Sequence, residues 1–313
     1  MKNLKHSLAA AASGLALLFA TGAQAQQQTT PTLVEDTRVA VEEVELSGPA
    51  LWKVSDEDTT IYLFGTVHVL PKDKVWLSPT IDSALDSSDS LVTEIVMTPD
   101  MTSTMQALVM QIGTLPEGET LRGKLDEQEL AAYDAAMTKL GLPVAAFDRY
   151  EPWMATLNLS MLPLLQQGYS PEAGVEKVLE GEADTALSRE GLETIEYQLG
   201  IFDNLPEDAQ IDYLIETAGM IDEIKPMLDL MVEEWLEGDA DALAALMNEG
   251  MAETPILAEK LLYERNANWS EWIDARRDEP GTIFIAVGAG HLAGTKSVQD
   301  LLEQRDIQVV RVQ

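Results

Sequence analysis

The 313-residue chain carries 54 acidic and 20 basic side chains and no cysteine. So large an excess of negative charge repels phosphate backbones and anionic lipid headgroups, which excludes nucleic acid as an expected partner. Without cysteine there is no disulfide framework, and a metal site would have to be built from His, Asp or Glu side chains. The apolar content and length suffice for one large domain or two modest ones.

The first 25 residues predict a secretory signal peptide. Lys2 and Lys5 form a basic start, residues 8–20 are a short apolar run, and residues 23–25 form a small-residue cleavage site, so we expect cleavage after Ala25. The apolar run is too short for a membrane span, and no later stretch predicts one. We therefore expect a periplasmic or secreted protein without a transmembrane segment. Its mature form would have 18 basic side chains against 54 acidic ones.

Residues 26–48 are polar and then acidic, with little periodicity, and predict a flexible linker before a folded domain at 49–313. Apolar runs at 51–54 and 60–64 flank a short polar turn, which is typical of a β-hairpin. The pair Ser78 and Pro79 predicts the start of a helix that ends near residue 87.

The run 90–96 predicts a buried strand, and Glu94 lies in it or at its end. A lone carboxylate in such a strand is costly to bury unless it is paired or binds a cation. Glu94 is therefore a candidate functional residue.

The middle of the chain, from about 102 to 280, is predicted to be a mostly helical lobe. A short strand and turn at 183–194 carries Glu193. The clearest helix starts at Asp126 and ends at Gly141. Further helices are expected at about 150–167, 171–182, 206–219, 221–237, 239–250 and 255–278.

The end of the domain returns to strand, helix and strand, with a strand from 282 into Gly288, a helix at about 295–304 and a strand at 307–312. The fold class is therefore predicted to be α/β (α+β), with one mixed sheet built from the N- and C-terminal strands. The large helical middle region would pack on that sheet.

Two Gly-x-x-His motifs each follow a buried strand, and they end at His68 and His291. The third histidine, His6, lies in the expected leader. Because ligands of open α/β sheets gather at the carboxyl ends of strands, these two histidines and Glu94 are predicted to meet at one edge. Two imidazoles and a carboxylate form a common divalent-metal site with open positions for water and substrate. The alternative is that each histidine only caps a loop or bonds a carbonyl group.

Several motifs together resemble the TraB/GumN family across residues 50–313. They are Leu-Trp-Lys-Val54, Gly-Thr-Val-His68, Glu94, Gly174-Val-Glu176, Leu192-Glu-Thr194 with Gln198, Arg265-Asn266 with Trp269, and Gly-Ala-Gly-His291. That family is similar to the Tiki metalloproteases and, more remotely, to ChaN-like haem-binding and erythromycin-esterase-like proteins.

The resemblance implies a mixed sheet flanked by helices and a divalent-metal-dependent hydrolase acting on peptides. By motif match, His68, Glu94 and His291 would be ligands or catalytic groups, and Arg265 a polar partner of the site. Glu193 would also be a site residue, by match to the Leu-Glu-Thr motif of the family. The sequence does not distinguish manganese, cobalt, iron and zinc.

In the expected mechanism, Glu193 or Glu176 acts as general base and Arg265 steadies an oxyanion or a substrate carboxylate. Each of these three side chains could equally form a structural ion pair. Asn266 is expected to fix its helix, and Trp269 to pack in the core.

An alternative function is a non-enzymatic binding protein that captures haem, iron or a signalling peptide in the same cleft. A haem would need an axial histidine or tyrosine, and His68 or His291 could serve.

Overall fold

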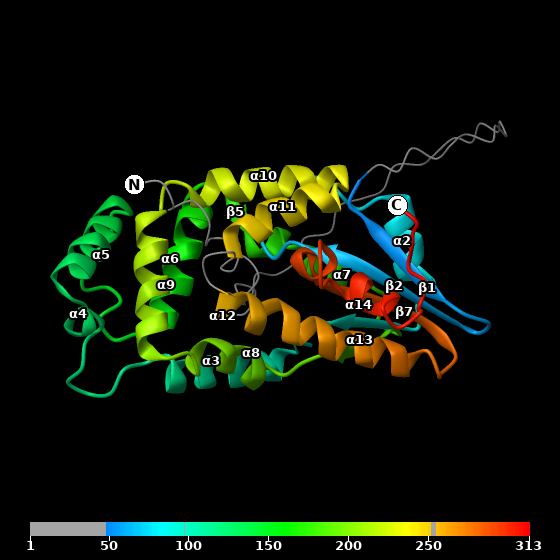
Figure 1. The fold of residues 1–313 in the computed structure, drawn as a ribbon, viewed down its shortest axis with the longest axis horizontal. Helices are drawn as coiled ribbons and strands as arrows, with labels where there is room; N and C mark the ends of the chain where they lie inside the picture. Colours follow the sequence, from blue (N-terminus) through cyan, green and yellow to red (C-terminus); the bar gives the residue numbers. More distant parts are fainter. Residues whose placement is uncertain (1–47, 97, 252–254) are drawn as a thin grey trace.

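The computed structural model describes residues 48–96, 98–251 and 255–313. The expected signal peptide and nearly all of the expected linker therefore lie outside the described residues. One half of the molecule is built around a β-sheet and the other half is helical (Figure 1).

A six-stranded mixed sheet has the order β6-β4-β7-β2-β1-β8, and β3 and β5 form a separate two-stranded ribbon. The strands are β1 (Leu51–Ser55), β2 (Thr59–Thr66), β3 (Leu70–Pro71), β4 (Ser90–Thr93), β5 (Tyr169–Ser170), β6 (Ser188–Gly191), β7 (Gly281–Gly288) and β8 (Val310–Arg311). The α/β class and the mixed sheet of terminal strands are confirmed. The middle of the chain also contributes β6, and the closing strand is shorter than predicted.

The four strands that matter most for the site are parallel neighbours. β4 pairs with β6 on one side and β7 on the other, and β7 pairs with β2, all in parallel register. The predicted hairpin of β1 and β2 is confirmed as an antiparallel pair. The carboxyl ends of β2, β4 and β7 therefore meet at the same edge of the sheet.

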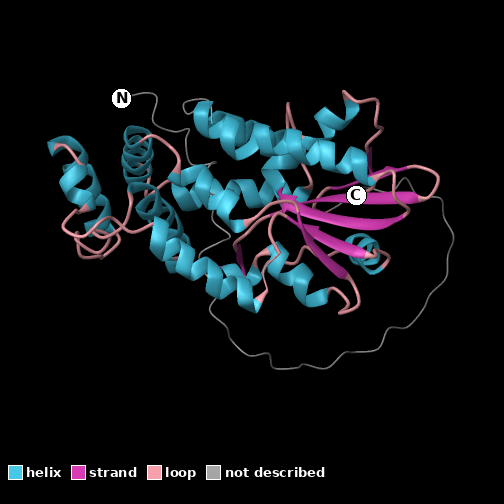
Figure 2. Ribbon diagram, turned by 90° about the horizontal axis from the view of Figure 1, so that it is seen from below, coloured by secondary structure: helices cyan, strands magenta, loops and turns pink. Residues whose placement is uncertain are grey.

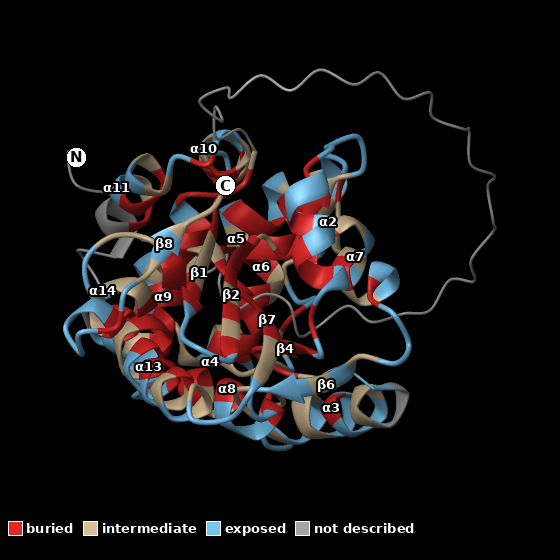
Figure 3. Ribbon diagram, turned by 90° about the vertical axis from the view of Figure 1, so that its right-hand side faces the viewer, coloured by how far each residue is buried: buried red, intermediate tan, exposed pale blue. Residues whose placement is uncertain are grey.

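Helices cover both faces of this sheet, as the view along the strands shows (Figure 3). The side chains of β7 alternate between the faces, because successive residues of a strand point to opposite sides. Ile283 and Ile285 pack in a cluster with Trp269 and Val298, from the two helices on one face. Phe284 packs in the larger cluster on the other face, which continues into the helical half.

The helices around the sheet and in the helical half are seen together from below in Figure 2. Their bounds are α2 (Pro79–Asp86), α3 (Pro99–Ile112), α4 (Leu121–Lys124), α5 (Glu127–Lys139), α6 (Pro152–Gln166), α7 (Val175–Glu182), α8 (Ile195–Asp203), α9 (Glu207–Gly219), α10 (Ile224–Glu237), α11 (Ala240–Met251), α12 (Pro255–Ala258), α13 (Glu264–Arg276) and α14 (Val298–Glu303). Short 3₁₀ turns η2 (Pro171–Ala173) and η4 (Ala289–Leu292) and a π-helical turn η3 (Glu259–Tyr263) complete the set.

Most predicted helices are present, and two of their ends follow the predicted chemistry. The Ser78 hydroxyl accepts a hydrogen bond from the N–H of Ile81 at the start of α2, and Asp126 caps α5 in a capping box. Helix α8 was not expected from the sequence, and it begins two residues after Glu193. Within the described ranges no helix combines the length and the apolar character that a membrane span requires.

Candidate functional site

The two histidines and Glu94 converge on the edge formed by three neighbouring strands. His68 follows β2, Glu94 follows β4 and His291 follows β7, which lies between the other two. A methyl group placed on Gly288 would lie 3.2 Å from Glu94 Oε1, 3.5 Å from His291 Cδ2 and 3.8 Å from His68 Nε2. All three side chains therefore border one small space above Gly288, as the strand positions predicted.

Each oxygen of the Glu94 carboxylate has a distinct set of partners. Oε2 accepts hydrogen bonds from Arg265 Nη2 at 2.5 Å and from Gln198 Nε2 at 2.9 Å. Oε1 accepts from the backbone N–H of Gly288 at 2.8 Å and lies 3.9 Å from His291 Nε2. The carboxylate is thus held from one side, and Oε1 is the oxygen that faces the histidines.

The hydrogen bonds of His291 define its tautomer. Asn266 Nδ2 donates to the carbonyl oxygen of Lys296 at 2.8 Å, so the amide oxygen of Asn266 faces His291 Nδ1 at 2.6 Å. Because that oxygen can only accept, Nδ1 carries the proton. The lone pair is then on Nε2, where Arg265 Nη1 donates to it at 3.1 Å.

His68 has a carboxylate oxygen at the corresponding ring nitrogen. Its Nδ1 lies 2.5 Å from Glu176 Oε1, which also accepts a hydrogen bond from the Thr66 hydroxyl at 2.5 Å. The carboxylate of Glu176 therefore lies against the Nδ1 side of the His68 ring.

Backbone contacts explain why Glu176 lies behind His68. The N–H of Val175 donates to the carbonyl oxygen of Val67 at 3.0 Å, which holds the first turn of α7 against the end of β2. Gly174 permits this approach, because a methyl group there would come within 2.1 Å of the His68 carbonyl oxygen.

Arg265 is held at the start of α13, directly after the π-helical turn η3. Its Nη1 donates to the carbonyl oxygen of Leu261 at 3.0 Å, one turn back. A π-helical turn rotates the residues that follow relative to those before it, and such turns occur often at functional sites. Here that rotation accompanies a guanidinium group that points into the site and is only 2% exposed.

Both oxygens of the Glu193 carboxylate accept hydrogen bonds from buried side chains. Oε1 accepts from Arg265 Nε and Trp269 Nε1, each at 2.9 Å, and Oε2 accepts from Arg265 Nη2 and Gln198 Nε2, each at 2.9 Å. The backbone ladder of β4 and β6 continues past the strands, since the Glu193 N–H donates to the Glu94 carbonyl oxygen at 2.8 Å. The two carboxylates therefore share one arginine.

The charge states of the buried groups follow from these contacts. Burial alone would raise the pKa of Glu94, but Arg265, the two histidines and the Gly288 N–H hold it well below its ordinary value of 4.5. Burial lowers the pKa of His291 well below 6.5, and the guanidinium of Arg265 adds to that. Burial works against the charge of Arg265, but Glu94 and Glu193 raise its pKa. At neutral pH the site therefore contains ionised Glu94, neutral His291 and charged Arg265.

All six residues singled out from the sequence come together here, and four more join them. Gln198 and Asn266 stood in the motifs, but only the fold reveals that Gln198 bridges two carboxylates and that Asn266 fixes an imidazole. Trp269 does pack in the core, 4.3 Å from the His291 ring between centroids, and it is also a donor to Glu193. Thr66 had no signal in the sequence beyond its place in the first motif.

Within the described part of the chain, no group of three His, Asp or Glu side chains is arranged so that it could hold a metal ion without moving. The guanidinium of Arg265 lies beside His291 Nε2, the atom that a cation would need.

Comparison with known proteins places the chain in a family without adding an activity. A curated relative, an uncharacterized protein of Treponema pallidum (strain Nichols), is 22% identical over 276 residues, which cover 81% of this chain and 80% of that protein. No solved structure matches the chain. The model of the TraB/PrgY/gumN family matches residues 50–311, so the chain belongs to that family.

Proposed function

We propose that this protein is a divalent-metal-dependent hydrolase, with peptides as its substrates. The observation that carries the proposal is that His68, His291 and Glu94 all border one small space at Gly288. Each imidazole also has an oxygen close to its Nδ1, from Glu176 for His68 and from Asn266 for His291. Histidines that ligate metals in proteins are commonly oriented by such an oxygen at the second ring nitrogen. The peptide class comes from the likeness to the Tiki metalloproteases.

The donor chemistry fits a divalent cation. His68 and His291 supply two imidazole nitrogens and Glu94 one carboxylate oxygen, the set used by sites that keep open coordination positions. The buried groups also favour a cation, because two carboxylates share the single positive charge of Arg265. A divalent cation bound there would supply a water of lowered pKa and polarise the substrate carbonyl.

The other side chains have positioning roles in this proposal. Glu176 orients His68, and Asn266 orients His291. Glu193 was expected to be a general base, but four short contacts from donors occupy its carboxylate, so it is better suited to fixing Arg265. Arg265 was expected to steady an oxyanion, but its three nitrogens already contact Glu193, Glu94, His291 and the Leu261 carbonyl oxygen, so it is better suited to holding Glu94 in place. In the overall reaction the C–N bond breaks, and water supplies the hydroxyl of the new acid and a proton to the new amine.

A second candidate function is capture of a peptide without turnover. The observation that favours it is the 3.1 Å contact between Arg265 Nη1 and His291 Nε2, which occupies the lone pair that a cation would use. The haem alternative fits less well, because the cavity beside His68 has a volume of about 50 Å³, far below that of a porphyrin.

The decisive experiment compares metal content and peptide cleavage in the same preparations. Elemental analysis of the purified protein should find about one divalent metal per chain, and a His68→Ala, His291→Ala variant should have none. Cleavage of a peptide library should then stop with chelator. Glu180→Gln, a change on the same helix as Glu176 at a partly exposed ion pair, is the matched control and should keep its metal.

Negligible metal in the unaltered protein, after incubation with manganese, cobalt, iron and zinc, would exclude the metal-dependent hydrolase. Peptide binding that is insensitive to chelator would then support the second candidate. Export to the periplasm or the medium is part of the proposal, and N-terminal sequencing of the protein from those fractions tests it against the expected cleavage after Ala25.

A further inference from the structure

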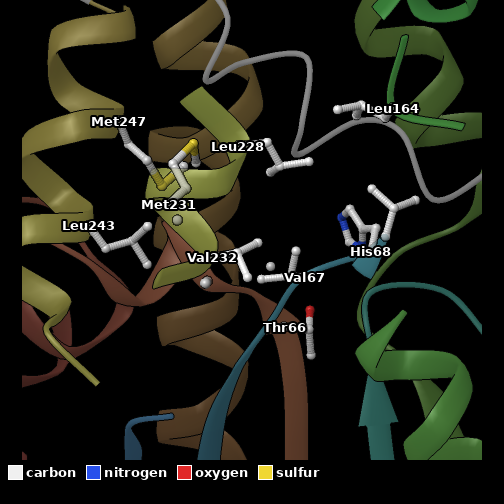
Figure 4. A pocket seen from close by; sticks show the side chains of 13 residues that line it. Thr66, Val67, His68, Leu164, Leu228, Met231, Val232, Leu243 and Met247 are labelled. Carbon is white, nitrogen blue, oxygen red and sulfur yellow. The ribbon is translucent and has the colours of Figure 1, made fainter. Parts of the chain in front are cut away.

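An apolar pocket opens directly beside His68. Its walls include side chains of the three helices α6, α10 and α11 and of the end of β2, and His68 lies on one side while two methionines lie on the other (Figure 4). The aliphatic and thioether side chains in these walls include those of Val67, Leu228, Met231, Val232, Leu243 and Met247. The backbone of residues 288–290 forms another wall, so the pocket and the candidate site share both His68 and Gly288.

The apolar side chains that line the pocket disfavour a charged ligand group. Apart from His68 and Thr66, the described residues that line the pocket have no polar side chain. A charged group that entered would lose its hydration without gaining a partner, which costs several kcal/mol. An aliphatic group would lose nothing and would remove apolar surface from water.

The size of the pocket restricts the ligand further. Its volume is about 50 Å³. An engineered protein cavity that binds benzene has roughly 150 Å³. The pocket is therefore suited to a methyl or isopropyl group. It has little room to grow towards the strands, because a methyl group on Gly290 would come within 2.1 Å of Met247 Cε, so this methionine already packs on the backbone.

We propose that this pocket binds the side chain of a small aliphatic residue, alanine or valine, next to the scissile bond of a peptide substrate. The inference rests on the proposed function. Its geometric basis is that the pocket and the candidate site share His68 and Gly288. A substrate residue whose side chain lies between Met231 and Gly288 would therefore have its backbone beside His68 and the edge of the sheet at Glu94. The pocket thus makes the hydrolase selective for small apolar residues at one position and leaves the other positions open.

The test uses one peptide sequence in which a single position is Ala, Val, Leu, Phe or Asp. The unaltered protein should cleave the Ala and Val peptides with kcat/KM at least about 10-fold above the Leu, Phe and Asp peptides, the discrimination that one or two methylene groups give in an apolar pocket. Met231→Ala enlarges the pocket and should raise kcat/KM for the Leu peptide by roughly 10- to 100-fold. Leu243→Phe should have the opposite effect and reject Val while it retains Ala.

Met227→Ala is the matched control, because Met227 lies on the same helix but does not line the pocket. It should leave the ranking of the peptides unchanged. Circular dichroism on each variant shows whether it is folded, and the two pocket variants change the ranking in opposite directions, which general destabilisation does not do.

The outcomes separate this inference from the proposed function. Cleavage without a preference for Ala and Val, or a ranking that neither pocket variant alters, overturns the pocket and leaves the hydrolase standing. If no peptide is cleaved, the hydrolase fails, and calorimetric binding of the same five peptides decides the pocket. Equal binding of all five, or no binding, overturns the inference. Tighter binding of the Ala and Val peptides that shifts to Leu in Met231→Ala supports it.

Discussion

His68 and His291 follow their strands at the same spacing, but they lie in different surroundings. His291 is fully buried and contacts an amide, an aromatic ring and a guanidinium group. His68 is 9% exposed, contacts a carboxylate that is itself partly exposed, and lines the apolar pocket. One motif therefore belongs to a buried polar network and the other to the surface of a cavity.

This difference indicates that the two motifs have different roles. A buried, fully bonded network is rigid, because every alternative arrangement leaves a polar group without a partner. The His291 half can thus fix where Glu94 and Arg265 lie. The His68 half lines the apolar pocket, which in the proposed function is the space through which a substrate would enter. Changes on the His291 side should affect folding and function together, and changes on the His68 side should affect mainly function.

The largest expected effect is on the His291 side. Arg265→Met removes the one cation that two buried carboxylates share, so we expect the free energy of unfolding to fall by about 3–5 kcal/mol. Arg122→Met is the control, since Arg122 forms a similar two-bond pair with Asp148 near the surface and should cost no more than about 1 kcal/mol. Denaturant unfolding measures both. Equal losses in the two variants would contradict a buried network.

The next largest effect is expected at Gly288, which faces the small space between the two histidines and Glu94. Gly288 has a backbone conformation that alanine adopts freely, with φ −48° and ψ 132°, so Gly288→Ala should fold. Its methyl group would nevertheless lie among the two histidines and Glu94, and we expect metal binding to be lost by elemental analysis. Gly181→Ala, on α7 with no atom within 4 Å of the added methyl group, should keep the metal. A Gly288→Ala variant with a full complement of metal would place the ligand elsewhere.

The partners of the two imidazoles provide a paired comparison. Glu176→Gln and Asn266→Ala should each weaken metal binding by roughly 10- to 100-fold, because each removes the group that orients a ligand. Their effects on stability should differ. Asn266→Ala leaves His291 Nδ1 and the Lys296 carbonyl oxygen unbonded and should cost about 1–3 kcal/mol, whereas Glu176→Gln should cost less than about 1 kcal/mol. Isothermal titration with metal measures the first effect and denaturant unfolding the second. Similar losses of stability in the two variants would argue against different roles for the two motifs.

The smallest expected effect is a pH dependence of stability in the metal-free protein. His291 faces Arg265, Glu94 and His68, and its pKa in the folded state lies well below 6.5. The unfolded chain therefore binds a proton below pH 6.5 that the folded chain does not, and stability falls as the pH falls. Between pH 6.5 and 5.5 this amounts to about 1 kcal/mol. The slope should be absent in His291→Gln, measured by denaturant unfolding with chelator present, and an unchanged slope would assign the titration to another group.

Periodicity and spacing in the sequence are enough to predict the class of fold and the edge on which the site lies. Buried runs that end in glycine predict parallel strands, and the carboxyl ends of parallel neighbours meet, so His68, Glu94 and His291 could be placed together before the fold was known. The helix starts at Ser78 and Asp126 were predictable for a similar reason, since capping depends on residues only a few positions apart.

The roles of the remaining groups depend on contacts between distant segments. From the sequence, Glu176 and Glu193 were candidate general bases and Arg265 a candidate partner of an oxyanion or substrate carboxylate, and each could equally have formed a structural ion pair. Only the tertiary structure assigns Glu176 to His68 Nδ1 and joins Glu193 to Arg265, 72 positions further along the chain. Hydrogen-bond partners follow from distance and direction in space, which local pattern does not encode. The sequence therefore determined which groups meet at the edge of the sheet, and the packing of α7 and α13 against that edge decided what each group does there.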